Sequence, residues 1–252
     1  MKIDRSGEIN TNKYNTKMII IEYNNNRDVL VKFLDEHGYT VRCQYKNFKN
    51  GSLVNPFDIS VQGKGYIGIG KYNNTDYPKL YNTWNGMLER CYNPYTINKY
   101  PTYIDCTVDE RFLCLQDFGK WYEENYYEIQ GDRMCLDKDI LIKNNKIYSP
   151  DTCIFVPHRI NVLFTKNNIN RGNLPIGVTR TGHNHFVASC YTIDHNAPKN
   201  NYLGTYDNAL DAFIAYKNFK EDYIKKVADD YRKLIPDKLY KAMYNYTISI
   251  RD

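Results

Sequence analysis

The sequence contains no apolar run long enough to cross a membrane and no two cysteines in C-x-x-C spacing. A membrane-spanning helix needs roughly 20 consecutive apolar residues, so we expect no membrane partner. Structural zinc sites are typically built on such close cysteine pairs, and a zinc fold therefore has no support. The seven cysteines are odd in number, most have apolar neighbours, and no signal peptide is visible. We therefore expect reduced core thiols in a cytoplasmic protein.

Alanine is scarce, whereas asparagine occurs 30 times and tyrosine 25 times among 252 residues. Mean hydropathy is −0.66. A tyrosine ring packs while its hydroxyl stays hydrated, so this composition indicates a folded chain with amphipathic surfaces, not a disordered one.

The net charge of +5 is concentrated at the two ends of the chain. Basic residues outnumber acidic ones by 10 to 7 over 1–70 and by 13 to 9 over 166–252, while the acidic residues lead by 13 to 11 over 71–165. Basic flanks fit contact with a polyanion, and an acidic middle fits a cation site. Ordinary fluctuation explains the same distribution equally well.

We expect an α+β protein with three domains, and the first is a small N-terminal β-module over residues 1–70. Residues 18–23 (MIIIEY) and 28–35 (DVLVKFLD) predict a β-hairpin around NNNR, and residues 39–48 alternate as a third strand. The glycine-rich residues 63–72 (GKGYIGIGKY) lack the Gly-Lys-Ser/Thr sequence and the following helix of a phosphate loop, so we expect turns there. The module is either an accessory nucleic-acid contact or a stabilising element.

The second expected domain covers residues 71–165. Apolar residues at helical spacing predict one amphipathic helix over 79–93 and another over 116–126, with Trp84 and Trp121 as their core anchors.

The rest of this domain is predicted as strand, hairpin, strand and helix. RMCLD ends a strand at Asp137, and ILIKNNKIY predicts a hairpin that turns at Asn144-Asn145. Ser149-Pro150-Asp151 has the pattern of a helix start. CIFVP predicts a short strand, and HRINVLF begins a helix.

The third expected domain, over residues 172–252, carries IGVTRT, HFVASCYTI and NNYLGTY as three strands. Asp207 is the expected cap of a long helix, in which Ala209, Ala212, Phe213 and Tyr216 share one side, and a C-terminal helical tail follows Pro236.

This third segment resembles the plant ethylene-response (Apetala-type) DNA-binding domain. The resemblance rests on Gly177-Val178, on Phe186 and Ala188, on Leu203-Gly204-Thr205-Tyr206-Asp207, and on the alanine-rich helix through Ala215-Tyr216. It implies a three-stranded sheet that lies in the major groove of double-stranded DNA. By position, the implied DNA-binding residues are Thr179, Arg180, His185, Ser189, Tyr191 and Tyr202. Arg180 is the strongest candidate, because a guanidinium binds guanine or phosphate through two hydrogen bonds.

The second segment resembles the HNH (ββα-metal) nucleases found in phage-encoded homing endonucleases, through the series LDKD…NN…SPDTCIFVP…N. The resemblance places Asp137 and Asn161 at metal-ligand positions and Asn144 or Asn145 in an asparagine-rich loop. Oxygen ligands suit Mg²⁺ or Mn²⁺.

The position of the general base, usually a histidine, holds Lys138. An ordinary lysine has a pKa of about 10.4, and the flanking Asp137 and Asp139 favour its charged form, so Lys138 is better suited to contact phosphate. Asp139 or His158 is then the alternative base. Without the resemblance, Asp137 and Asp139 are also typical turn residues.

Together these patterns predict a DNA-binding, metal-dependent endonuclease acting in the cytoplasm of a phage-infected bacterial host. They leave the oligomeric state open, with a monomer as one option. The alternative is a catalytically decayed DNA-binding protein of the same build. A third hypothesis is a protein that uses these modules to bind another protein.

Overall fold

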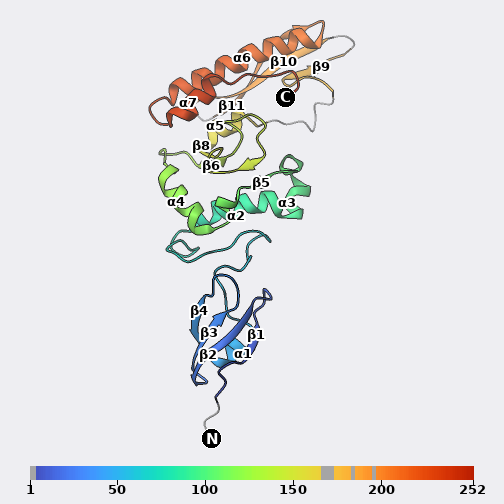
Figure 1. Cartoon of the computed structure of the whole chain (residues 1–252). Coiled ribbons are helices and arrows are strands. Elements are labelled where there is room, and N and C mark those ends of the chain that lie inside the picture. Colours follow the sequence, from blue (N-terminus) through green and yellow to red (C-terminus); the bar gives the residue numbers. More distant parts are fainter. Residues whose placement is uncertain (1–3, 166–172, 183–184, 195–196) are drawn as a thin grey trace. The chain divides into compact units, whose positions relative to one another are not determined.

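The computed structural model describes residues 4–165, 173–182, 185–194 and 197–252, and shows an α+β protein (Figure 1). The chain forms two compact units: residues 1–124 with 146–150, and residues 125–145 with 151–252. These boundaries differ from the three expected domains, a division that stays a prediction. No helix in the described ranges is long and apolar enough to span a bilayer.

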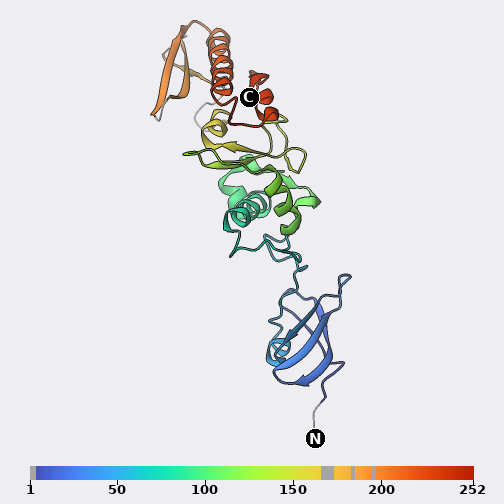
Figure 2. The same ribbon diagram turned by 90° about the vertical axis from the view of Figure 1, so that its left-hand side faces the viewer.

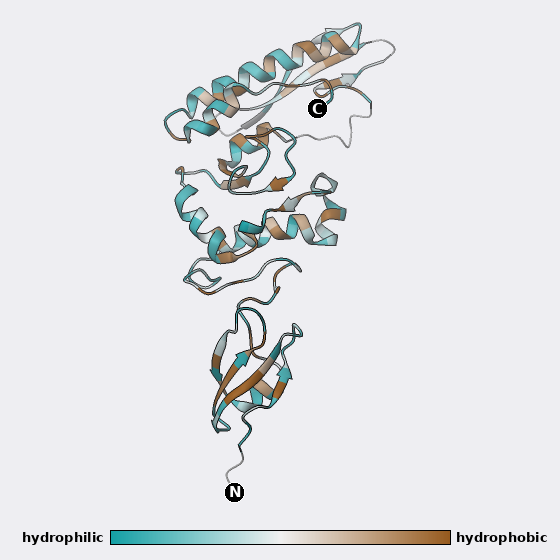
Figure 3. Cartoon of the chain, viewed as in Figure 1, coloured by the Kyte–Doolittle hydropathy of each residue, from teal (hydrophilic) through white to brown (hydrophobic). Residues whose placement is uncertain are grey.

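The first unit begins with an antiparallel meander of β1 (Ile9–Thr11), β2 (Lys17–Asn25), β3 (Asp28–Phe33) and β4 (Thr40–Cys43), in that order. The predicted β2–β3 hairpin is confirmed, and Figure 3 shows apolar residues along both strands. Alternate residues enter one core, which includes Met18, Ile20, Val29, Val31 and Phe33.

The predicted third strand is too long, because residues 45–49 form a short helix, α1 (Tyr45–Lys49). The helical turn carries Phe48 back onto the sheet, where its ring is fully buried in the same core. An extended chain would alternate side chains between the two faces, so burial of Phe48 decides the local conformation.

The helical part of the first unit has α2 (Pro78–Tyr92), α3 (Pro94–Lys99) and α4 (Leu115–Asn125), with η1 (Pro101–Tyr103), β5 (Thr107–Val108) and η2 (Glu110–Phe112) between them. Both predicted helices and both tryptophan anchors are confirmed. Trp84 is fully buried and its Nε1–H donates to the Phe112 carbonyl at 2.8 Å. Trp121 packs edge-to-face on Phe112.

The predicted hairpin over ILIKNNKIY is wrong. β7 (Ile147–Tyr148) pairs in parallel with β5, so its partner lies about 40 residues earlier in the chain. Tyr148 is buried in the first unit, where Arg90 Nε donates to its hydroxyl at 3.0 Å, whereas Ile140 belongs to a core of the second unit. The alternation identified a strand, but alternation alone does not identify the partner.

The second unit contains β6 (Met134–Asp137) paired antiparallel with β8 (Ile154–Pro157), followed by α5 (His158–Leu163). The Ser-Pro-Asp pattern before β8 is a turn, not a helix start.

The remainder of this unit is a sheet in the order β11 (Ala197–Tyr206), β10 (Phe186–Asp194), β9 (Val178–Arg180), then α6 (Ala209–Asp230) and α7 (Asp237–Tyr244). The three predicted strands are confirmed. Asn208, not Asp207, caps α6, because its Oδ1 accepts the Asp211 N–H at 2.9 Å.

Figure 2 shows α6 running along one face of the three-stranded sheet. Val178, Ala188 and Cys190 of the sheet pack against Ala212, Phe213 and Tyr216 of the helix. Beyond that contact, α6 contributes Ile224 and Ala228 to a second core, which it shares with β8, α5 and α7.

Two helical glycines provide a matched test of the packing in the first unit. A Cβ on Gly119 of α4 would lie 2.3 Å from the Tyr72 ring, whereas one on Gly86 of α2 would meet only Arg90 Nη1 at 3.7 Å. We expect Gly119→Ala to lower the free energy of unfolding by about 1–3 kcal/mol through overpacking. Gly86→Ala should raise it by roughly 0.5–1 kcal/mol, since alanine is the better helix former. Urea denaturation measures both, and equal effects would contradict this account of Gly119.

Candidate functional site

Asp137 ends β6, and its side chain accepts hydrogen bonds from two backbone N–H groups of the loop that follows. Its Oδ1 receives the N–H of Asp139 at 2.9 Å and that of Ile140 at 2.7 Å. This is the local side chain-to-backbone turn typical of aspartate. Burial, with a smaller contribution from the nearby Asp139 carboxylate, raises the pKa of Asp137 to about 6. The structural role of Asp137 is therefore established by its contacts.

Lys138 is buried, and its ammonium is bound by its neighbour. The Nζ atom lies 3.0 Å from Oδ2 of Asp139, with the Lys138 side chain 8% exposed and that of Asp139 44% exposed. Asn145 donates from Nδ2 to the Lys138 carbonyl at 2.7 Å and so closes the loop over this pair. A buried, ion-paired ammonium is poorly placed to contact phosphate, and Asp139 holds a cation of the protein itself.

His158 lies at the other end of the β6–β8 pair. Its backbone N–H donates to the Arg133 carbonyl at 2.7 Å, and its Nδ1 lies 3.1 Å from Nη2 of Arg133. Arg133 precedes Asp137 by four strand positions, which is roughly 13 Å of extended chain. This placement separates His158 from Asp137 and argues against His158 as the base for a reaction there.

Asn161 lies on α5, which packs against the two-stranded pair. Its neighbour Ile160 shares a core with Ile140, the residue whose N–H Asp137 accepts. Helix α5 and the loop after Asp137 therefore meet, but no hydrogen bond between the Asp137 and Asn161 side chains occurs in the described part of the chain.

These donors do not fit a protein-held metal. Within the described ranges, no three side chains from histidine, cysteine, aspartate and glutamate gather into a possible metal site. One oxygen of Asp137 already accepts two backbone N–H groups, and the Lys138 ammonium is adjacent in the chain. Mg²⁺ binds to an octahedron of oxygen ligands, and the described acidic side chains near Asp137 do not form such a set.

The sheet presents a second group of candidate residues on the face opposite α6, here called the outer face. Alternation places Ser189 and Tyr191 opposite the buried Ala188 and Cys190. Cross-strand pairing adds residues from both neighbouring strands. The outer face includes Thr179, Ser189, Tyr191, Asn200, Tyr202 and Thr205.

Two tyrosines dominate this outer face. Tyr191 is 60% exposed and Tyr202 is 68% exposed. The Tyr202 hydroxyl lies 2.8 Å from Oγ1 of Thr205, which orients the ring along the strand. No arginine or lysine is among the outer-face side chains that the structure describes.

Arg180 does not belong to the outer face. It pairs with Phe186, and the adjacent pair of Val178 with Ala188 is buried against α6, so alternation turns Arg180 toward the helix side at the end of its strand. Its guanidinium stacks 5.4 Å from the centroid of the Phe186 ring and stays exposed. His185 is also exposed, with Nδ1 3.7 Å from Oδ1 of Asp207.

One residue with functional character was not predicted from the sequence. Lys220 lies on α6 between Tyr216 and Ile224, at intervals of four residues, and is buried at 8% exposure. A charged residue that interrupts an otherwise apolar helical stripe is a signal that the sequence contains.

Comparison of the chain with known proteins found no matching family model, no matching curated protein and no matching solved structure.

The raised pKa of Asp137 predicts how stability changes with pH. Between about 3.8, the ordinary value, and about 6, the folded chain binds more protons at this site than the unfolded chain does. The free energy of unfolding should therefore fall as pH rises through this window and level off above it. Asp137→Asn keeps an oxygen acceptor for the turn but removes the titration.

We expect the melting temperature of Asp137→Asn, measured relative to that of the wild type, to increase as pH rises from 4 to 7. Asp222→Asn makes the same chemical change at an exposed position and is the matched control. Parallel curves for Asp137→Asn and the wild type would show that this carboxyl is not perturbed.

Proposed function

We propose that this chain binds double-stranded DNA through the outer face of the β9–β11 sheet. The observation that carries the proposal is the pair of exposed tyrosines, Tyr191 and Tyr202, on a face that α6 leaves uncovered. Hydroxyls and an amide accompany them at Thr179, Ser189 and Asn200. These groups can donate to and accept from base edges, while the rings contact apolar base surfaces.

The width of the sheet fits the groove. Three strands spaced about 4.8 Å apart extend over roughly 10 Å, and the major groove of B-form DNA is about 12 Å wide. The resemblance to the Apetala-type domain implies the same mode of binding, in which the face of the sheet lies in the major groove toward the bases.

The exposed cations lie at the ends and margins of the sheet. Arg180 is at the end of β9, and Lys199 is exposed on β11. Each neutralised phosphate contributes about −0.9 to the slope of log binding constant against log salt. Two such contacts give a slope near −2, so we expect DNA binding with a shallow salt dependence.

The tyrosines provide the test of this interface. We expect the double variant Tyr191→Ala/Tyr202→Ala to bind a mixed-sequence DNA duplex at least about tenfold more weakly, which is roughly 1.4 kcal/mol. Its salt slope should stay unchanged, because the rings contact bases and not phosphates. Fluorescence anisotropy over a salt series measures both quantities.

Tyr95, which is 74% exposed on α3 of the first unit, provides the control. Tyr95→Ala should bind as the wild type does. Unchanged affinity of the double variant would exclude the outer face as the interface, and absence of DNA binding by the wild type at low salt would favour the hypothesis of a protein partner.

A second candidate function is metal-dependent endonuclease activity at Asp137, as the HNH resemblance implies. It is favoured by one observation: two antiparallel strands are followed by a helix that packs on the loop after Asp137. The Lys138–Asp139 ion pair and the distant His158 favour the non-catalytic DNA-binding protein instead.

A plasmid-nicking assay separates the two functions. We expect no nicking of supercoiled DNA with Mg²⁺ or Mn²⁺ beyond the level given by Asp137→Asn, a variant that retains the turn acceptor and therefore the fold. Nicking by the wild type that Asp137→Asn abolishes would establish the endonuclease and contradict the expectation.

A further inference from the structure

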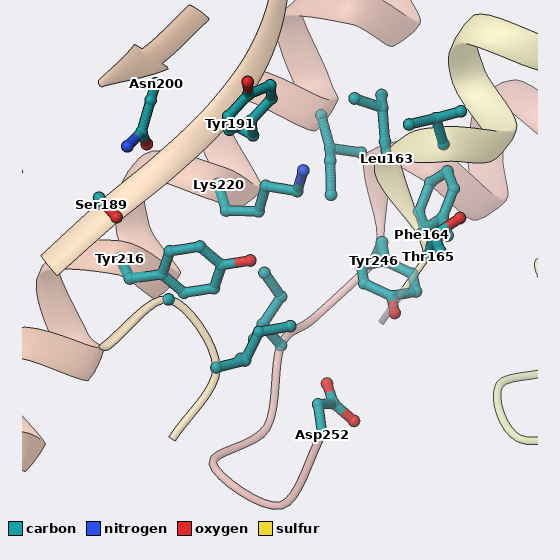
Figure 4. Close-up of a pocket in the computed structure, with 15 residues that line it drawn as sticks. Leu163, Phe164, Thr165, Ser189, Tyr191, Asn200, Tyr216, Lys220, Tyr246 and Asp252 are labelled. Carbon is teal, nitrogen blue, oxygen red and sulfur yellow. The ribbon is translucent and has the colours of Figure 1, made fainter. Parts of the chain in front are cut away.

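A cavity of about 440 Å³ lies within the second unit, beside the middle of α6 (Figure 4). Its walls come from α6, from the C-terminal end of α5, from the edge of β10 and from the chain after α7. β9 pairs with β10 only over Phe186–Ala188, and the Ser189 N–H then donates to the Gly177 carbonyl at 2.9 Å. The Tyr191 N–H points to the same edge by alternation. The volume lies within the range of small-molecule sites, about 300–1,000 Å³.

The side chain of Lys220 enters this cavity. Figure 4 shows its amine directed into the space near Tyr216, Tyr191 and Leu163. The residue is 8% exposed, and no hydrogen bond or ion pair of its Nζ occurs within the described ranges. Among the described residues, Arg5 Nε is the side-chain atom that is both fully buried and without a hydrogen-bond partner. Lys220 Nζ does not belong to this group although it has no partner among these residues, so it is not fully buried and still borders open space.

An ammonium in this position costs stability. Removing an ion from water costs several kcal/mol unless a partner compensates for it, and burial lowers the pKa of Lys220 while the nearby Cys190 opposes that shift. Tyr216 and Ile224, one turn before and one turn after, are apolar core residues. A methionine would continue their stripe without this cost.

Asp252, the acidic residue among the described wall residues, is already paired with a cation. Asp252 binds Lys143 Nζ through Oδ2 at 2.6 Å and accepts the Ser249 N–H at 2.9 Å. The described walls otherwise consist of tyrosines, apolar residues and uncharged polar groups. The cavity therefore has a positive point in an apolar, partly aromatic setting.

We propose that this cavity binds a small organic anion, whose carboxylate or phosphate group pairs with Lys220 Nζ and whose flat apolar body packs against Tyr216, Ile224 and Phe164. The cavity shares Ser189, Tyr191 and Asn200 with the outer face, so it borders the proposed DNA interface, but Lys220 itself is not part of that interface. A ligand anion provides the missing partner of the ammonium, and an apolar body displaces water from the remaining walls.

Binding to the full-length chain tests the proposal with three probes of one shape: benzoate, phenyl phosphate and the neutral benzyl alcohol. By isothermal titration calorimetry, we expect one site per chain for at least one of the two anions, and weaker binding of benzyl alcohol. The comparison of the two anions tells which anionic group the site selects. Inorganic phosphate tests whether the apolar body is needed.

Lys220→Met should weaken binding of the anion at least tenfold, whereas Lys226→Met, at an exposed position of the same helix, should leave it unchanged. Lys220→Met should also melt a few degrees higher than the wild type, because it removes a buried charge. Equal anion binding by Lys220→Met and the wild type, no binding of either anion at millimolar concentration, or equal binding of benzyl alcohol would overturn the proposal.

Reductive methylation of the wild type provides a measurement that does not depend on how the variants fold. The bound anion should protect the Lys220 amine from formaldehyde and borohydride, as read by mass spectrometry, and should leave Lys226 reactive. Unchanged methylation of Lys220 at saturating anion would likewise overturn the proposal.

Discussion

The packing of α6 against two cores is the constraint on which the second unit depends. The helix has 22 residues, which is about 33 Å at 1.5 Å per residue. Ala212 and Phe213 hold the three-stranded sheet, while Ile224 and Ala228 hold the β6–β8 pair with α5 and α7. Because one helix serves both cores, displacing it disturbs the outer face and the Asp137 loop together. Lys220 lies on α6 between Tyr216 of the first core and Ile224 of the second.

The polar groups after β6 show how local structure can occupy residues that resemble a catalytic set. The Asp137 carboxylate accepts backbone N–H groups of the loop, and the Asp139 carboxylate pairs with the buried Lys138 ammonium. The Asn145 amide donates to a backbone carbonyl of the same loop. Each interaction satisfies a group that burial would otherwise leave costly. The same residues would need other partners to bind a metal or a phosphate, so stability and catalysis compete at this loop.

The sequence predicted the elements whose signals are local. The period of Trp84, Met87 and Leu88 identified α2, and the alternation of Ala188 and Cys190 identified β10. It did not predict the partner of Ile147–Tyr148, because parallel pairing with Thr107–Val108 depends on the burial of Tyr148 against α2. Four of the expected site residues share the outer face: Thr179, Ser189, Tyr191 and Tyr202. Arg180 and His158 are directed elsewhere by strand register, which no local pattern encodes.

The parallel β5–β7 pair also affects the order in which the chain can fold during synthesis. The chain leaves the first unit after residue 124, builds β6 in the second unit, and returns for residues 146–150 before leaving again. The first unit therefore lacks one of its strands until the ribosome has already released β6. A nascent chain that stops after α4 exposes the edge of β5 and leaves Arg90 without Tyr148, so the first unit can be completed only once residues 146–150 have been made.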